Sequence, residues 1–294
     1  MAQEKIQLRK IRDFGEVFSD TFQFIRQEFK PLLLAFTIIG LSFVILDSVL
    51  LVLYRSHLQE VSSYLRSGNA TPTFSTIFSI YDGTFFLMIL ISIVSFAAMF
   101  TCIAVYMKYY EEHEISPATN ELWRIFFKYF PRTLILALIT TVIVIVGFLF
   151  CFFPALYFAF VFMPYAFIVV NEDVSVGQAF SRCFAIIKEN FWASAGLYIV
   201  VGILMLMFSF LIAIATQIIT GAGSLFSMEA YEGSNPIWDI VLNIFQYYFY
   251  IVLYVAVGLQ YYNLVERKDG AGLAKRLDML GSDINPNDNI EEQY

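Results

Sequence analysis

Asp47 is the residue whose type and position most directly indicate chemistry. It lies about 16 residues into a long apolar stretch, where a carboxylate costs at least about 2.5 kcal/mol unless it is paired, protonated or hydrated. One interpretation is a proton or cation site in the outer third of a membrane. The other is a structural carboxylate that pairs with Arg55, eight positions further along the helix, or with a neighbouring helix.

Three amides are expected at a depth similar to that of Asp47. Gln217 comes near the end of one apolar stretch, while Asn243 and Gln246 come early in the next one. Together with Asp47 they would line a polar cavity that opens to the outside. The alternative is ordinary hydrogen bonding between membrane helices, which contributes about 0.6 kcal/mol for each bond on average.

Other reactive residue types form no recognisable constellation. Glu111, Glu112, His113 and Glu114 are consecutive, so in a regular helix they cannot all point at one metal ion, and the chain has only two histidines. There is no phosphate-binding glycine loop, no nucleophile elbow and no HExxH motif. The sequence therefore predicts no enzyme, with no catalytic residues, no cofactor and no metal.

The polar residues are carried by six hydrophobic stretches. A membrane-spanning helix needs about 20 mostly apolar residues. With 59% hydrophobic and 15% charged residues, the chain predicts an all-α polytopic membrane protein rather than a soluble domain, which carries about 25% charged residues. The expected helices are residues 31–54, 84–107, 133–150, 155–170, 193–219 and 237–265.

The positive charges predict the orientation. Of the 18 lysines and arginines, only Arg55 and Arg66 fall on the outer side of the expected helices. Lysine and arginine concentrate on the cytoplasmic side of membrane proteins, so both termini are expected in the cytoplasm. The lipid bilayer is the predicted environment, and no basic stripe indicates nucleic acid as a partner.

Three segments before the odd-numbered membrane helices share an apolar stripe with helical spacing, which indicates an internal repeat. The stripes consist of Phe14, Phe18, Phe22, Ile25 and Phe29; Ile115, Trp123, Phe126 and Phe130; and Val176, Phe180, Phe184, Ile187 and Phe191. Each unit would be a cytoplasmic amphipathic helix followed by a transmembrane hairpin. The units span about residues 13–107, 115–170 and 175–265; the alternative is a coincidental match.

Start signals support these amphipathic helices. Asp13 with Glu16 and Ser175 with Gln178 have the spacing of capping boxes, and Ser116 precedes Pro117 as an expected N-cap. Pro31 and Pro131 would mark the elbows into the membrane helices. Residues 1–266 are then the membrane domain, and residues 267–294 are a cytoplasmic tail expected to be largely disordered.

Several segments resemble a group of bacterial six-helix membrane proteins. They are EDVSVGQAFSRCFAIIKENFW (172–192) after PALYFAFVFMPYAFIVV, the opening FGEVFSDTFQFIRQEFKPLL, and QYYNLVERKDGAGLAKRLDMLG. The group includes the membrane domain of some glycerophosphodiester phosphodiesterases and related uncharacterised families, with stand-alone members in Bacteroidetes. The resemblance implies the bacterial inner membrane. It implies no phosphodiesterase activity, because the catalytic barrel of the fused members has no counterpart here.

Two functions are compatible with this pattern. The first is a non-catalytic scaffold, assembly factor or accessory subunit with a protein partner in the membrane or at its cytoplasmic face. Its contacts with the partner or with headgroups would come from Phe18, Phe22, Trp123, Phe126, Phe180 and Phe184. The alternative is a transporter or lipid-handling protein with a polar site around Asp47.

Overall fold

The computed structural model describes residues 5–67, 78–220 and 236–270, and nearly all of these residues are helical. The α-helices are α1 (Phe14–Gln27), α2 (Phe29–Arg66), α4 (Gly83–His113), α5 (Thr119–Phe150), α6 (Phe152–Phe162), α7 (Tyr165–Glu172), α8 (Val176–Ile187), α9 (Phe191–Thr220), α10 (Pro236–Phe249) and α11 (Ile251–Asp269). Within the described residues, 6 helical stretches are long and apolar enough to cross a membrane. The prediction of an all-α protein with six such helices is confirmed.

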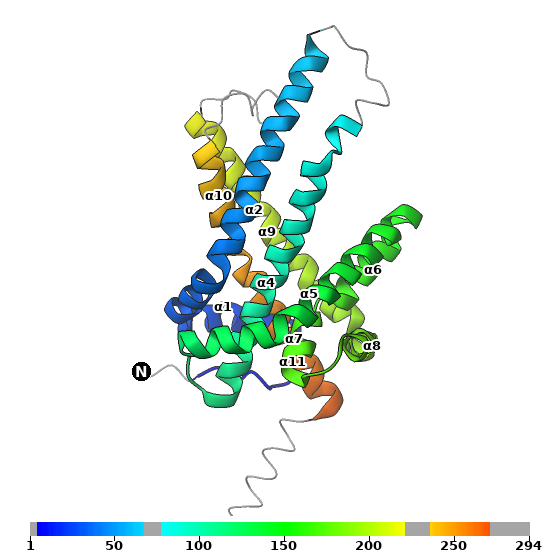
Figure 1. The fold of residues 1–294 in the computed structure, drawn as a ribbon. Helices are drawn as coiled ribbons and strands as arrows, with labels where there is room; N and C mark the ends of the chain where they lie inside the picture. The colour runs from blue at the N-terminus through cyan, green and yellow to red at the C-terminus, as the bar shows by residue number, and fades with distance from the viewer. Residues whose placement is uncertain (1–4, 68–77, 221–235, 271–294) are drawn as a thin grey trace, which may run out of the picture.

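The helices form two arms that rise from a common base (Figure 1). The long helices α2 and α4 pack against each other along their length, with α9 and α10 beside them, and the α5–α6 hairpin diverges to the other side. The base is the end that carries α1, α7 and α8, together with the described chain ends at Lys5 and Gly270. The opposite end of α2 and α4 is called the tip.

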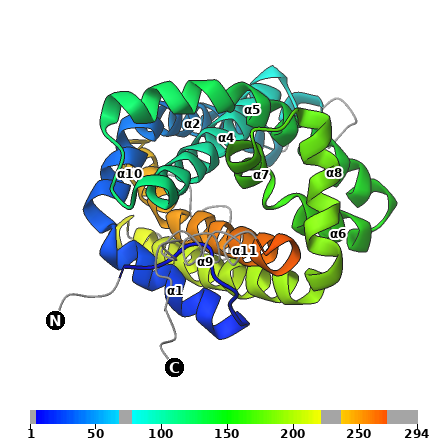
Figure 2. The ribbon, with the colours of Figure 1, turned by 90° about the horizontal axis from the view of Figure 1, so that it is seen from below.

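The core lies at the base. On α4 every residue from Ala97 to Met107 is buried, and on α7 every residue from Tyr165 to Val170 is buried. Seen from below, the other helices surround α4, α7 and α11 (Figure 2). The buried stretches of α4 and α7 are almost entirely apolar, and neighbouring helices cover them on all sides.

Two of the expected membrane helices are interrupted. The helix expected at 155–170 is divided between α6 and α7, because Pro164 has no N–H to donate and its ring crowds the preceding turn. At this break the N–H of Met163 bonds the nearer carbonyl of Phe160, at 3.3 Å. The helix expected at 237–265 is divided between α10 and α11 by a one-residue turn at Tyr250, across which the N–H of Tyr250 still bonds the carbonyl of Gln246 and the N–H of Tyr254 bonds that of Tyr250.

The second amphipathic segment differs from its prediction. It does not form a helix of its own, since α5 begins at Thr119 and continues through Pro131 to Phe150. Ala118, not Ser116, is the N-cap, and the Ser116 hydroxyl instead donates to Glu28 Oε2 at 3.0 Å. Neighbouring helices can accommodate a proline inside a membrane helix, so Pro131 does not end α5.

The first and third amphipathic segments begin as predicted. Asp13 Oδ1 accepts from the N–H of Glu16 at 2.7 Å, and the Glu16 side chain accepts from the N–H of Asp13 at 3.0 Å, which closes the capping box. At α8 the Gln178 side chain accepts from the N–H of Ser175 at 3.0 Å. Residues 271–294, the larger part of the expected tail, lie outside the described residues.

Candidate functional site: a hydroxyl-lined cleft in front of Asp47

Asp47 lies inside the protein, with 5% of its surface exposed. Its carboxylate accepts two hydrogen bonds, one from Ser92 of α4 at 2.5 Å and one from Tyr247 of α10 at 3.0 Å. Of the alternatives for Asp47, these bonds correspond to pairing with neighbouring helices, whereas Arg55 Nη1 lies 3.4 Å from Asp239 Oδ2. Asp47 therefore connects α2, α4 and α10.

The predicted amides take different positions. Asn243 reaches the neighbourhood of Asp47, since its Nδ2 donates to the hydroxyl of Ser48 at 3.2 Å. Gln246 points to another helix and donates to Ser209 of α9 at 3.0 Å. The side chain of Gln217 lies outside the described residues.

A cleft of about 400 Å³ opens in front of Asp47, between α4, α5, α7 and α10. This volume falls within the range of small-molecule sites, about 300–1,000 Å³. The cleft is lined by Ile89, Ser92, Ile93, Phe96, Ala137, Thr140, Thr141, Tyr165, Tyr247 and Tyr250. Ser92 and Tyr247 thus face both the cleft and the Asp47 carboxylate.

Both interrupted helices contribute to this cleft. Tyr165 is the first residue of α7, directly after Pro164, and Tyr250 separates α10 from α11. Binding sites in membrane transporters commonly form where membrane helices are discontinuous. The breaks and the cleft therefore coincide in space.

Two of the residues that line the cleft carry buried hydroxyls without a partner. The hydroxyls of Thr140 and Tyr165 are buried and make no hydrogen bond. A buried hydroxyl without a partner is destabilised by the loss of its hydration, so such groups in a native protein call for an explanation.

Sequence reasoning did not identify Ser92, Thr140, Tyr165 or Tyr247. Serine, threonine and tyrosine are ordinary in membrane helices, and no spacing marks these four. The one available signal was Pro164, which indicates a break in a short apolar helix and hence a position where side chains could gather.

The six aromatic side chains expected to form a contact surface are placed unequally. Phe126 is fully buried and packs in the core, so its ring is not available to a partner. Phe18, Trp123, Phe180 and Phe184 are partly buried against the core. Phe22 is 41% exposed.

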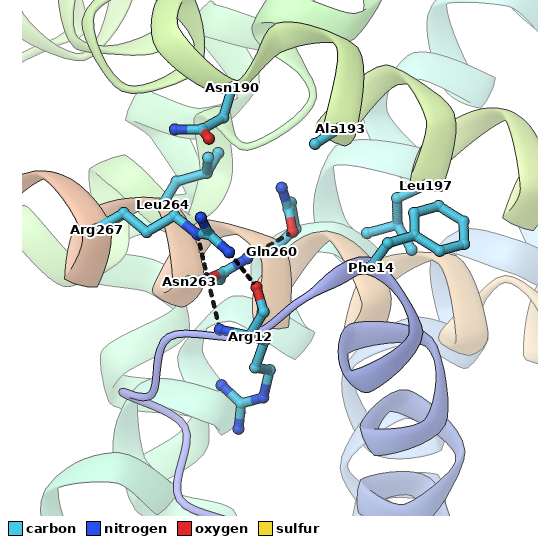
Figure 3. A pocket seen from close by; sticks show the side chains of 9 residues that line it. All are labelled: Arg12, Phe14, Asn190, Ala193, Leu197, Gln260, Asn263, Leu264 and Arg267. Carbon is cyan, nitrogen blue, oxygen red and sulfur yellow. Dashed lines mark hydrogen bonds between the residues drawn. The ribbon is translucent and has the colours of Figure 1, made fainter.

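A second, smaller cavity lies at the base, between the N-terminal segment, α9 and α11. It measures about 60 Å³, and Figure 3 shows the residues that line it. Asn263 accepts from the N–H of Arg12 at 2.9 Å and from Arg267 Nε at 3.1 Å, while Gln260 donates to Ser194 at 2.8 Å. The guanidinium of Arg12 points away from the cavity (Figure 3). These bonds satisfy the amides of Gln260 and Asn263 internally, and the space is large enough for water.

Ion pairs tie the helices together at the base. Asp173, between α7 and α8, accepts from Lys128 and Arg132 of α5, both at 2.7 Å. The hydrogen bond from Lys128 holds the pKa of Asp173 below its ordinary value, and Arg132 acts in the same direction. Arg182 of α8 pairs with both Glu172 and Asp269, which joins α7, α8 and α11.

The acidic run at the end of α4 is also engaged in structural contacts. Glu111 pairs with Arg9 at 2.9 Å. Within the described part of the chain, no three histidine, cysteine, aspartate or glutamate side chains are arranged to hold a metal ion.

Comparisons of this chain with protein-family models, with curated proteins and with solved structures find no match. The resemblance to six-helix bacterial membrane proteins therefore stays a prediction.

Proposed function

We propose that this protein is a multi-pass membrane protein of the bacterial inner membrane that binds a lipid in the cleft between α4, α5, α7 and α10, without catalysing a reaction. One observation carries this proposal. A cleft of about 400 Å³ at membrane depth combines apolar walls with the partnerless hydroxyls of Thr140 and Tyr165. Apolar walls suit an acyl chain, and the hydroxyls suit the polar atom of an otherwise apolar molecule.

The position of the cleft supports a ligand that comes from the bilayer. Thr140 lies nine residues after Pro131 on α5, a rise of about 14 Å, which is near the middle of a hydrocarbon layer about 30 Å thick. A water-soluble ligand would have to cross half of this layer, whereas a lipid chain is already there.

Filling the cleft tests the proposal. Ala137 lines the cleft, and Ile139 lies on the same helix with its side chain exposed. We expect Ala137→Phe to reduce the lipid that stays with the protein through mild-detergent purification, measured by native mass spectrometry. Ile139→Phe adds the same ring at a position facing away from the cleft and should leave the bound lipid unchanged. Equal retention in wild type and both variants would contradict lipid binding in this cleft.

The proposed orientation places the base in the cytoplasm, in agreement with the distribution of lysine and arginine. Cys151 is exposed at the α5–α6 turn, whereas Cys102 and Cys183 are buried. In intact cells, a membrane-impermeant maleimide should label Cys151, and it should label a Gly270→Cys substitution only after permeabilisation. The reverse pattern would contradict this orientation.

The exposure of two aromatic side chains at the base favours the scaffold function. Phe22 of α1 and Phe127 of α5 are exposed at the base, where a partner or headgroups could cover them. The threefold repeat belongs to the same proposal, because α1, the first part of α5 and α8 would be its equivalent contact helices. Replacing Phe22 and Phe127 by serine should then remove a protein that co-purifies from native membranes, while Ala137→Phe should not.

A further inference from the structure

The hydrogen bonds to Asp47, behind the cleft, determine whether the hydroxyls that line the cleft can donate or accept a further hydrogen bond. Each hydroxyl has one proton to donate and two lone pairs that accept. Ser92 and Tyr247 both use their proton on Asp47. Towards the cleft, these two oxygens can therefore only accept a hydrogen bond.

The residues of α5 and α7 that line the cleft add both a hydrogen-bond acceptor and hydrogen-bond donors. Thr141 donates its proton to the carbonyl of Ala137 at 2.8 Å, so its oxygen is a further acceptor. The hydroxyls of Thr140 and Tyr165 are buried and uncommitted, so their protons are free for a ligand that reaches them. A group that fits all of these side chains has to donate and accept at the same time.

The charges exclude an anion. None of the residues that line the cleft is lysine or arginine, and the nearest charge behind Ser92 and Tyr247 is the Asp47 carboxylate. Arg55 lies towards the tip, where it is paired with Asp239. A phosphate or carboxylate in the cleft would lose its hydration with no cation to replace it, beside a carboxylate of the same sign.

We propose that the cleft selects the un-ionised hydroxyl head of a lipid alcohol. This inference rests on the proposed lipid binding and names its substrate class. The alcohol proton is donated to the oxygens held by Asp47, and the alcohol oxygen accepts from Thr140 or Tyr165. Asp47 acts as a positioning residue, because it fixes the direction of the Ser92 and Tyr247 protons without touching the lipid.

Three photoreactive lipids with the same long chain distinguish the chemistry. One carries a terminal alcohol, one its methyl ether and one its phosphate monoester. They are added to the full-length protein in phosphatidylcholine nanodiscs, and the labelled peptides are identified by mass spectrometry. We expect labelling of α4, α5 and α10 peptides by the alcohol. Labelling by the ether should be about tenfold weaker, because it loses the donated hydrogen bond, and labelling by the phosphate should also be weaker, because its charge meets no cation.

Variants test the role of each group. Tyr247→Phe removes an acceptor and should weaken alcohol labelling about tenfold, whereas Tyr157→Phe makes the same change on α6, away from the cleft, and should have no effect. Asp47→Asn frees one hydroxyl proton and removes the negative charge. It should therefore lower the alcohol-to-phosphate labelling ratio, although a phosphate still meets no cation in the cleft. Size-exclusion chromatography of each variant reports whether it folds.

The outcomes separate the two proposals. If none of the three lipids labels the cleft above the level in Ala137→Phe, the proposed lipid binding itself is wrong. If all three label it equally, lipid binding stands and selection of an alcohol is wrong. An unchanged alcohol-to-phosphate ratio in folded Asp47→Asn would also overturn the inference.

Discussion

Tyr247 and Asp47 lie 200 positions apart in the sequence, and the phenol of Tyr247 donates to the Asp47 carboxylate at 3.0 Å. This bond closes the contact between the first and last of the membrane-spanning stretches. It also explains how a carboxylate persists within a helix that is otherwise apolar, since a buried charge is tolerated where hydrogen bonds replace its hydration.

Removal of this carboxylate should destabilise the protein. Asp47→Ala leaves the hydroxyls of Ser92 and Tyr247 without their acceptor, and we expect a loss of about 1–3 kcal/mol in the free energy of unfolding. The measurement is denaturant unfolding in detergent micelles. Glu60→Ala removes an exposed carboxylate from the same helix and should change the free energy little. Equal effects of the two substitutions would show that the Asp47 bonds contribute nothing.

Close packing in the α5–α6 hairpin depends on Gly147. A Cβ at this position would lie 2.9 Å from the Cα of Ala155 and 3.0 Å from its backbone N, too close for any side-chain rearrangement to relieve. We expect Gly147→Ala to lower stability by about 1–3 kcal/mol. Gly202→Ala on α9 meets no atom within 4 Å and should stabilise by up to about 1 kcal/mol. Thermal unfolding of the two variants should give shifts of opposite sign, and a shift of the same sign in both would contradict the packing.

The base should lose stability in acid through Asp173. Its pKa is lowered in the folded state by Lys128 and Arg132, so its contribution is present above the unfolded pKa of about 3.9 and is lost as the pH falls through the lower folded value. We expect Asp173→Asn to flatten this part of the stability profile between about pH 5 and pH 2. Asparagine tolerates the left-handed backbone of residue 173, which has φ 48°, so the substitution changes the charge without adding strain. A profile identical to wild type would contradict the assignment.

The end of α4 holds a strained residue that can be relieved. Glu114 follows the last turn of α4 with φ 54°, a conformation that glycine adopts without cost. Glu114→Gly should therefore stabilise the protein by about 1 kcal/mol, and the Lys5 bond to the backbone carbonyl of residue 114 stays intact. Glu112→Gly, two residues earlier and inside α4, should destabilise by about the same amount. Equilibrium unfolding of both variants checks the predicted difference in sign.

The segment before α1 depends on Arg12, the bulkiest fully buried side chain, which is 1% exposed. Its guanidinium binds the carbonyls of Gln7, Leu8 and Lys10 and the carboxylate of Asp20. We expect Arg12→Met to release residues 5–12 from the base, seen as faster amide hydrogen exchange in this segment. Lys10→Met alters an exposed side chain and should leave the exchange rates near those of wild type. Unchanged exchange in Arg12→Met would show that the segment is held in another way.

The amount that sequence alone could predict differs between the fold and the site. Length and apolarity identify six membrane helices, because the bilayer imposes one length on each of them. They do not predict the continuity of α5 through Pro131, which depends on neighbours that only the folded chain brings together. The break at Tyr250 has no signal of its own, since it contains neither proline nor glycine.

From the sequence, the site was predictable only through the charged residue Asp47. Asp47 is conspicuous because carboxylates are rare in hydrocarbon. Ser92, Thr140 and Tyr165 are not conspicuous, because uncharged hydroxyl residues are ordinary in membrane helices and no spacing marks these three. Their importance comes from a shared location on different helices, which is a property of packing.

The contact between Arg12 and α11 has a consequence for biosynthesis. The backbone of Arg12 is held by Asn263 and Arg267, which follow it by 251 and 255 positions. At about 5–20 residues per second, a ribosome needs roughly 13–50 s to travel that distance. During this interval the nascent segment lacks its final docking partners. The segment around Arg12 can therefore dock on α11 only after the last membrane helix has been synthesised.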